Sequence, residues 1–261
     1  TDAPVVVTHS ELNMFLSCRR KWAWYFVHDR QKPERHHGPL ALGSRVHAAI
    51  EEYYKDGSDP IAAHERLAAE AVARAEADGE RFIDTLYEDI IVGRNCVIAH
   101  QQWLEDTGAD SNYDVEMVEE KLEAPILGGR VLLRGKVDVM FRERDSGALF
   151  ISDLKTSGNW WGGQRELLER SYQHHVYLAL TQLVHPETEF IGGALYTVIK
   201  KMRNLDRATG PVVERFRAPA TRRMAATKLR QIEAICAEML RVADEVRGGN
   251  EDIAYPTPQQ A

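Results

Sequence analysis

The sequence has few cysteines and no long apolar segment. Its three cysteines, Cys18, Cys96 and Cys236, are odd in number and far apart, which argues against a disulfide framework and favours a reducing compartment. No hydrophobic run approaches the roughly 20 residues that a membrane-spanning helix needs, and the first residues lack the basic start and apolar stretch of a secretory signal. We therefore expect a cytoplasmic protein without a membrane partner.

A net positive charge is also missing. The 261 residues carry a formal net charge of −7, whereas proteins that bind polyanions usually show a basic surface. Between residues 196 and 230, however, only Asp206 and Glu214 are acidic, against ten basic residues: Lys200, Lys201, Arg203, Arg207, Arg215, Arg217, Arg222, Arg223, Lys228 and Arg230. This excess fits a phosphate backbone, and it equally fits a solvated basic surface without a partner.

The first part of the chain has the spacing of helices. With 44% hydrophobic residues, the chain is long enough to bury one large core. Apolar residues at helical intervals predict a helix from Ser10 that carries the aromatic run ending at Phe26, and further helices over residues 44–54, 61–78 and 82–105. We expect a single domain over residues 1–261, with a helical insertion at about residues 57–110.

The pattern changes to strands near residue 113. Strands are predicted over residues 115–126, 129–142 and 148–155, joined by glycine-containing turns into an antiparallel meander. A helix over residues 166–183, strands over 190–200 and 212–217, and a helix over 221–246 with Thr221 as its cap follow. The order predicts an α/β fold with a central mixed sheet flanked by helices.

The sharpest chemical feature is an acidic hairpin. Antiparallel pairing about the turn near Gly147 places Asp138 opposite a residue between Asp153 and Lys155, and side chains two apart on a strand share a face. The hairpin therefore gathers two carboxylates and one ammonium group. The apolar residues around them place these charges in a core hairpin, although a surface strand with an ion pair is the plainer interpretation.

A divalent cation would relieve the repulsion between the two carboxylates. Oxygen ligands suit Mg²⁺ or Mn²⁺, which can bridge the carboxylates, a phosphate oxygen and the attacking water. Lys155 would orient that water or stabilise the negative charge of the transition state. An Asp-x-Lys triplet alone is a weak motif, so the second aspartate on the preceding strand carries most of the weight.

These residues resemble the signature of the PD-(D/E)XK nuclease superfamily, which has a restriction-endonuclease-like core, and their surroundings resemble its RecB-like branch of CRISPR-associated and phage exonucleases. The sequence Gly43-Ser-Arg-Val-His47 is similar to the branch's G-x-x-x-H motif, and Gln173-His-His-Val-Tyr177 to its Q-x-x-x-Y motif. Cys18-Arg-Arg-Lys-Trp22 is similar to its early cysteine-basic-aromatic stretch. The resemblance covers about residues 10–255.

The resemblance implies roles for further residues. His47, Asp138, Asp153 and the backbone carbonyl of Leu154 would hold the metal, Gln173 and Tyr177 would position the substrate, and Glu119 or Glu120 would be a supporting acid. Each of these side chains also has a plain interpretation, as a half-buried helix histidine, a helix surface or a solvated strand edge.

Contacts with DNA are expected from basic and aromatic side chains. The candidates are Arg19, Arg20, Lys21, Lys200, Lys201, Arg203 and, for stacking on bases, Trp160 and Trp161. Packing or solvation explains the same residues without DNA. Many members of the branch hold a four-iron cluster on one early and three late cysteines, and only Cys18 matches a ligand position here, so we do not expect a [4Fe-4S] cluster in this chain.

The function implied is metal-dependent hydrolysis of DNA by an exonuclease. Linear or single-stranded DNA ends would be the substrate, in recombination, repair or phage DNA metabolism, with recombination or CRISPR-type proteins as partners. A non-cleaving DNA-binding or scaffold subunit with the same fold is the alternative from another class, and an endonuclease is a third interpretation.

Overall fold

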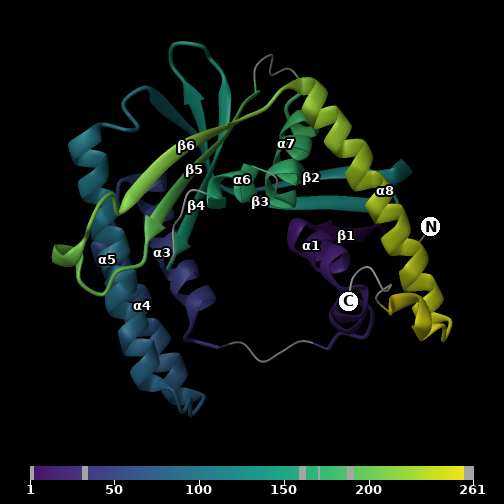
Figure 1. Ribbon diagram of the computed structural model, residues 1–261, viewed down its shortest axis with the longest axis horizontal. Coiled ribbons are helices and arrows are strands. Elements are labelled where there is room, and N and C mark those ends of the chain that lie inside the picture. Colours follow the sequence, from purple (N-terminus) through teal and green to yellow (C-terminus); the bar gives the residue numbers. More distant parts are fainter. Residues whose placement is uncertain (1–2, 31–34, 159–162, 170, 187–190, 256–261) are drawn as a thin grey trace.

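The computed structural model describes residues 3–30, 35–158, 163–169, 171–186 and 191–255. Within these residues, six strands form one mixed sheet with helices on both faces (Figure 1). The strands are β1 Val5–Thr8, β2 Tyr113–Ile126, β3 Val131–Glu143, β4 Leu149–Ser157, β5 Ile191–Lys200 and β6 Val213–Pro219. The strand order is β1-β3-β4-β5-β6, and β2 pairs with β3 as well. The predicted α/β fold with a central mixed sheet is confirmed.

Eight α-helices lie in the same described residues. They are α1 His9–Ser17, α2 Arg19–Trp22, α3 Pro39–Asp56, α4 Pro60–Ala77, α5 Ile83–Thr107, α6 Gly163–Glu169, α7 Tyr172–Val184 and α8 Arg222–Arg247. A π-helical segment, η1 Ala23–Val27, follows α2, and short 3-10 turns occur at η2 Leu127–Gly129, η3 Leu205–Arg207 and η4 Glu251–Ala254. No helix in the described part of the chain is long and apolar enough to span a membrane.

Strand β3 organises the sheet. It pairs with β2 over almost its whole length, and β1, β3 and β4 are consecutive in the strand order. β1 runs parallel to residues 131–134 of β3, whereas β4 runs antiparallel to residues 139–142. On the edge of β3 that faces β1 and β4, residues 135–138 therefore have no strand partner. We call this stretch the β3 gap.

Two apolar layers cover the faces of the sheet. On one face, α7, α1 and α8 pack over a core that includes Leu133, Ile151 and Leu178. On the other face, α3 and α5 pack over Leu154 and Ile199, with α4 packed on both helices (Figure 1). Burying these side chains supplies most of the stabilisation, at about 25 cal/mol for each Å² of apolar surface removed from water.

The helices that carry candidate site residues have defined ends. Helix α3 begins with Pro39, which has the backbone angle a first helical residue needs, and ends at Gly57 in the left-handed conformation. Helix α7 is capped by Ser171, whose hydroxyl accepts a hydrogen bond from the N–H of His174. Thr221 caps α8 in the same way, as the sequence predicted. These ends fix the register of each helix against the sheet.

One strand was missed, and two expectations about the helices were wrong. Strand β1 was not predicted, because a four-residue apolar strand is stabilised by pairing with residues 131–134 and not by a local pattern. The helix expected over residues 166–183 is two helices, because Ser171 begins α7 as its N-cap. The first helix is interrupted at Cys18, whose backbone is extended and whose thiol caps α2.

Candidate active site

Asp138 lies in the β3 gap, at the point where the alternation of β3 side chains between the two faces of the sheet is reversed. In a regular strand Val137 and Val139 would share a face. Here Val137 packs in the core under α7, whereas Val139 packs on the opposite side with Tyr54 of α3. The strand is therefore twisted at Asp138. On β2, Glu119 lies between the residues paired with Val137 and Val139, and it has a positive φ of 56°. This twist sets the Asp138 side chain between the two layers.

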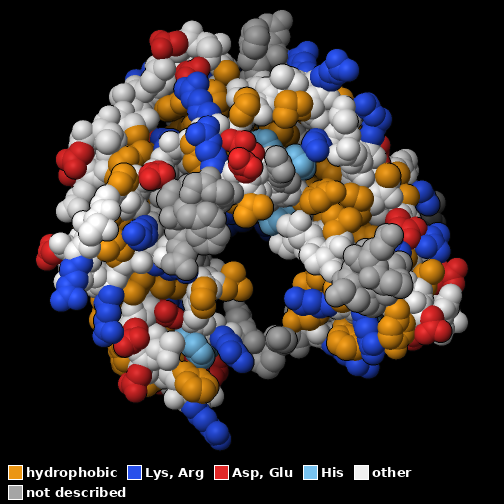
Figure 2. Space-filling view, viewed as in Figure 1, with side chains coloured by type: hydrophobic (Ala, Val, Ile, Leu, Met, Phe, Trp, Pro, Cys, Tyr) orange, Lys and Arg blue, Asp and Glu red, His pale blue; other side chains and the backbone are white. Residues whose placement is uncertain are grey.

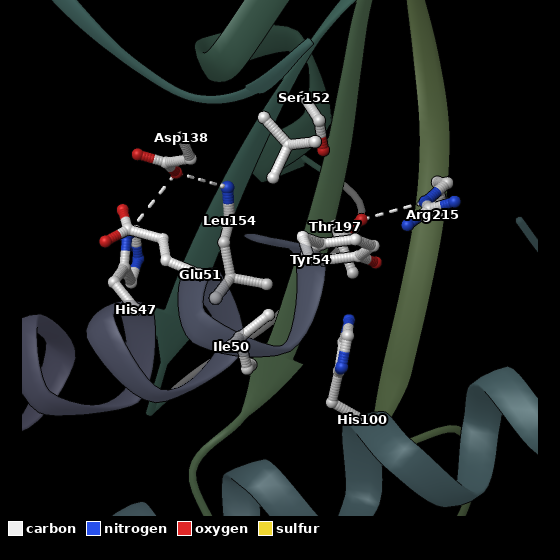
Figure 3. A pocket seen from close by; sticks show the side chains of 11 residues that line it. His47, Ile50, Glu51, Tyr54, His100, Asp138, Ser152, Leu154, Thr197 and Arg215 are labelled. Carbon is white, nitrogen blue, oxygen red and sulfur yellow. Dashed lines mark hydrogen bonds and ion pairs between the residues drawn. The ribbon is translucent and has the colours of Figure 1, made fainter. Parts of the chain in front are cut away.

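The Asp138 carboxylate joins β3 to its neighbours. Its Oδ2 accepts a hydrogen bond of 3.0 Å from the N–H of Leu154 and lies 3.4 Å from Nδ1 of His47 (Figure 3). The side chain thus replaces the ladder between β3 and β4, which ends at the Val139–Ser152 pair. The antiparallel pairing expected to continue through Asp138 is wrong in this detail. The strands separate because Asp138 occupies the space between them.

Asp153 and Lys155 share a face of β4, as predicted, and meet α7. Nζ of Lys155 lies 2.7 Å from Oδ2 of Asp153 and 2.9 Å from Oε1 of Gln173. Nε2 of Gln173 donates to Oδ1 of Asp153 at 2.7 Å and to the hydroxyl of Tyr177 at 3.3 Å. Four of the predicted site residues thus form one hydrogen-bonded network that joins β4 to α7.

The Tyr177 ring packs against the backbone of β3 within the β3 gap. A side chain at Gly135 would place its Cβ 2.8 Å from the Tyr177 ring, so the ring packs directly on the glycine backbone. Only glycine permits this approach. The buried ring keeps its hydroxyl beside Gln173, and burial raises the pKa of Tyr177 above its ordinary range. Tyr177 therefore stays protonated and serves as a fixed hydrogen-bonding group.

A group that could hold a metal ion lies on the other side of Asp138. One ligand atom each of His47, Glu51 and Asp138 lie within 4.8 Å of one another. His47 and Glu51 are one turn apart on α3, and both point toward Asp138 (Figure 3). Glu51 was missed by the sequence analysis, although the spacing His47-x-x-x-Glu51 places the two side chains on one helix face.

This donor set fits a divalent cation. It offers one imidazole nitrogen and two carboxylates, and oxygen-rich ligands of this kind suit Mg²⁺ and Mn²⁺. The carboxylates are crowded enough to need positive charge nearby. Burial, the hydrogen bond with Glu119 and the charge of Asp138 together raise the pKa of Glu51 to about 8. A cation between these groups would remove the cost of ionising Glu51.

The two aspartates differ in their electrostatics. Burial raises the pKa of Asp153 to about 6, and the neighbouring Asp138 adds to this shift while Lys155 opposes it. For Asp138 burial also favours the neutral form, but the hydrogen bond and charge of His47 and the Leu154 N–H outweigh it and lower the pKa. Asp138 is thus the stronger acid of the two.

The predicted supporting acids behave differently from each other. Glu119 forms an ion pair with Lys136, and both lie beside Glu51, with Nζ of Lys136 3.9 Å from Oε2 of Glu51. Glu120 is exposed in the ladder opposite Val137 and contributes to no group described here. Of the two, Glu119 is the one placed beside the candidate metal ligands.

The basic candidates for DNA contact are distributed unevenly. Arg19 forms an ion pair of 2.9 Å with Glu238 of α8, and the Arg20 guanidinium lies 4.4 Å from the centre of the Tyr255 ring. Both lie on the α8 side of the molecule, and Lys21 follows them on α2. Lys200 pairs with Ser157 at the end of β4, two residues beyond Lys155. Lys201 is bonded through its N–H to the same serine.

Part of the basic excess in residues 196–230 is structural. Arg203 pairs with Glu88 at 3.3 Å, Arg215 pairs with Asp110, and Arg217 pairs with Glu143. The Arg215 side chain also donates a hydrogen bond of 2.8 Å to the hydroxyl of Thr197. These side chains tie β6 and the loop after β5 to the rest of the fold, which the charge count could not distinguish from a nucleic-acid surface.

Trp160 and Trp161 lie outside the described residues. The three cysteines are free: Cys96 is buried in the core with α3 and α5, Cys236 is buried in the core with α7 and α8, and Cys18 is half-buried at the start of α2. They do not converge on a common site.

Comparison with protein families decides the relationship. A model of the PD-(D/E)XK nuclease superfamily matches residues 6–259. The chain belongs to this superfamily. No curated protein matches the nuclease. The resemblance inferred from Asp138, Asp153 and Lys155 is confirmed for the superfamily, and the RecB-like branch stays a prediction.

A solved structure supports the fold. The nuclease is similar to a crystal structure of the protein named "Putative exonuclease" from Eubacterium rectale, with a TM-score of 0.52 and 12% sequence identity. The match covers 91% of this chain and 80% of that chain. At this identity the likeness establishes a shared fold. It agrees with the restriction-endonuclease-like α/β core.

Proposed function

We propose that the nuclease is a divalent-metal-dependent deoxyribonuclease that acts on DNA ends. The observation that carries this proposal is the continuity of the site from α3 to α7. His47 and Glu51 face Asp138 on one side of β4, and Asp153, Lys155 and Gln173 are joined on the other. Such a set combines ligands for a cation with a fixed ammonium group.

In this proposal His47, Glu51 and Asp138 hold Mg²⁺ or Mn²⁺, with Asp153 and the Leu154 carbonyl as further ligands. A bound divalent cation supplies polarisation of a phosphate oxygen and lowers the pKa of water. The Lys155 ammonium, held by Asp153 and Gln173, orients the attacking water or stabilises charge on the phosphate. Because two groups hold it at 2.7 and 2.9 Å, it needs little reorganisation during the reaction.

Action on DNA ends follows from the resemblance to RecB-like exonucleases, and the shape of the molecule supports it. Figure 2 shows histidine side chains, with acidic side chains nearby, on the side of an opening between the two sides of the molecule. Such an opening beside the candidate site would give a DNA strand access to it. We expect the substrate pathway to be recombination, repair or phage DNA metabolism, with protein partners from such systems.

The test compares end-labelled linear DNA with covalently closed circular DNA, in Mn²⁺, Mg²⁺ or a chelator. We expect metal-dependent loss of the linear DNA alone, and no loss with Asp153→Ala. Asp145→Ala is the matched control, because Asp145 lies in the exposed turn between β3 and β4 and bonds to Asn112. Cleavage of closed circles would indicate an endonuclease. Binding without cleavage in either metal would indicate a scaffold subunit.

A further inference from the structure

His9 is a candidate for contact with the substrate strand that no sequence motif suggested. It is the first residue of α1 and directly follows Thr8, the last residue of β1. Thr8 pairs with Arg134, so His9 lies where the β3 gap begins. Asp153 and Lys155 lie on β4, which borders the other end of the same gap.

The surroundings of His9 belong to the reaction site. Its ring meets the Tyr177 ring edge-on, with 5.7 Å between the ring centres. The charges of Lys155 and Asp138 both act on its imidazole. Its Nε2 lies 3.2 Å from the hydroxyl of Ser10, and the side chain is half-buried, so it remains reachable from solvent. His9 thus faces the site from the side opposite His47.

The two sides of the gap differ in charge. The α3 side carries the carboxylates of Glu51 and Asp138, which repel phosphate unless a cation lies between them. The β1 side carries an uncharged imidazole, because burial and the Lys155 ammonium lower the pKa of His9 to about 4. A neutral imidazole can donate one hydrogen bond to a phosphate oxygen and does not compete with the cation.

We propose that His9 binds a phosphate of the DNA strand next to the scissile one, and thereby positions the strand across the β3 gap. This inference rests on the proposed function. The DNA strand would then be bound at two places, by the cation ligands of α3 and β3 on one side and by His9 at the end of β1 on the other. His9 acts on binding of the strand, so its loss should raise KM and leave kcat nearly unchanged.

The experiment measures steady-state cleavage of end-labelled linear DNA in Mn²⁺ by the wild type and by substitutions of His9. We expect His9→Ala to raise KM about tenfold, the loss expected for one hydrogen bond to a charged group, with kcat within about twofold. His9→Gln keeps a donor and should recover most of the affinity. His9→Phe keeps a ring against Tyr177 and should behave like the alanine variant.

The control is His28→Ala, because His28 pairs with Glu251 away from the gap and its loss should leave KM unchanged. Thermal unfolding of each variant checks that the fold is retained. An unchanged KM in His9→Ala, a normal KM in His9→Phe, or a loss confined to kcat would each overturn the inference while the nuclease activity stands. Absence of cleavage by the wild type would overturn the proposed function, and the role of His9 with it.

Discussion

Replacing Glu51 by glutamine should stabilise the metal-free nuclease at high pH and weaken its binding of Mn²⁺. In the folded chain the pKa of Glu51 is raised from its ordinary 4.5 to about 8, chiefly by burial, and further by Glu119 and Asp138. At about 1.4 kcal/mol per unit of pKa difference, this shift corresponds to about 5 kcal/mol of folding free energy. The residue is 7% exposed, so solvent screens little of it.

The direction follows from proton binding. Between pH 4.5 and about 8 the folded wild type keeps the Glu51 proton and the unfolded chain loses it. The stability that this proton supplies is therefore complete below pH 4.5 and is lost as the pH rises through 8. Glutamine does not titrate. The free energy of unfolding of Glu51→Gln, relative to the wild type, should rise by up to about 5 kcal/mol between pH 4.5 and pH 9.

Urea unfolding with a chelator at several pH values measures this difference, and titration calorimetry measures Mn²⁺ affinity. We expect the affinity of Glu51→Gln to fall at least about tenfold. Glu52→Gln is the matched control, because the neighbouring Glu52 is paired with Arg66 outside the cluster. Parallel pH profiles for Glu51→Gln and wild type, or an unchanged Mn²⁺ affinity, would refute the assignment of Glu51.

Three further outcomes are expected. Gly193→Ala should lower the free energy of unfolding by about 3 kcal/mol in urea titrations, because the φ of Gly193 is +117° and the added Cβ would lie 2.0 Å from a backbone carbonyl oxygen of β6. Gly158→Ala is the control and should have little effect, because the space around its Cβ is open. Ser171→Ala should cost about 1 kcal/mol by removing the α7 cap, and the exposed Ser44→Ala should not, as thermal unfolding would show. Mn²⁺ should raise the melting temperature of the wild type and have a much smaller effect on Asp138→Asn, and equal shifts would contradict the role of Asp138 as a ligand.

Much of the fold could be predicted from local patterns. The meander of β2, β3 and β4 was predicted because its strands carry alternating or continuous apolar runs between glycine turns, and the amphipathic helices α3, α4, α5 and α8 were predicted for a similar reason. Strand β1 and the break before α7 were not predicted. The first depends on pairing with residues more than a hundred positions away, and the second on one serine that acts as a cap.

The candidate site was predictable in composition and less so in geometry. Asp138, Asp153 and Lys155 follow from strand alternation, but alternation assumes a regular strand. The turnover of β3 at Asp138 depends on how β1, β2 and β4 divide its edges, which no local pattern contains. Glu51 was not predicted, because the sequence does not distinguish an acidic helix residue that faces the sheet from one that faces solvent.

The twist at Asp138 has a consequence for how activity arises during folding. The candidate cation ligands of α3 come from one layer of the molecule and the Gln173 and Tyr177 contacts from the other, and β3 and β4 between them contribute side chains to both layers. A half-assembled chain, with either layer missing, would lack part of the site. On the proposed function, cleavage would therefore begin only after both layers have packed on the sheet.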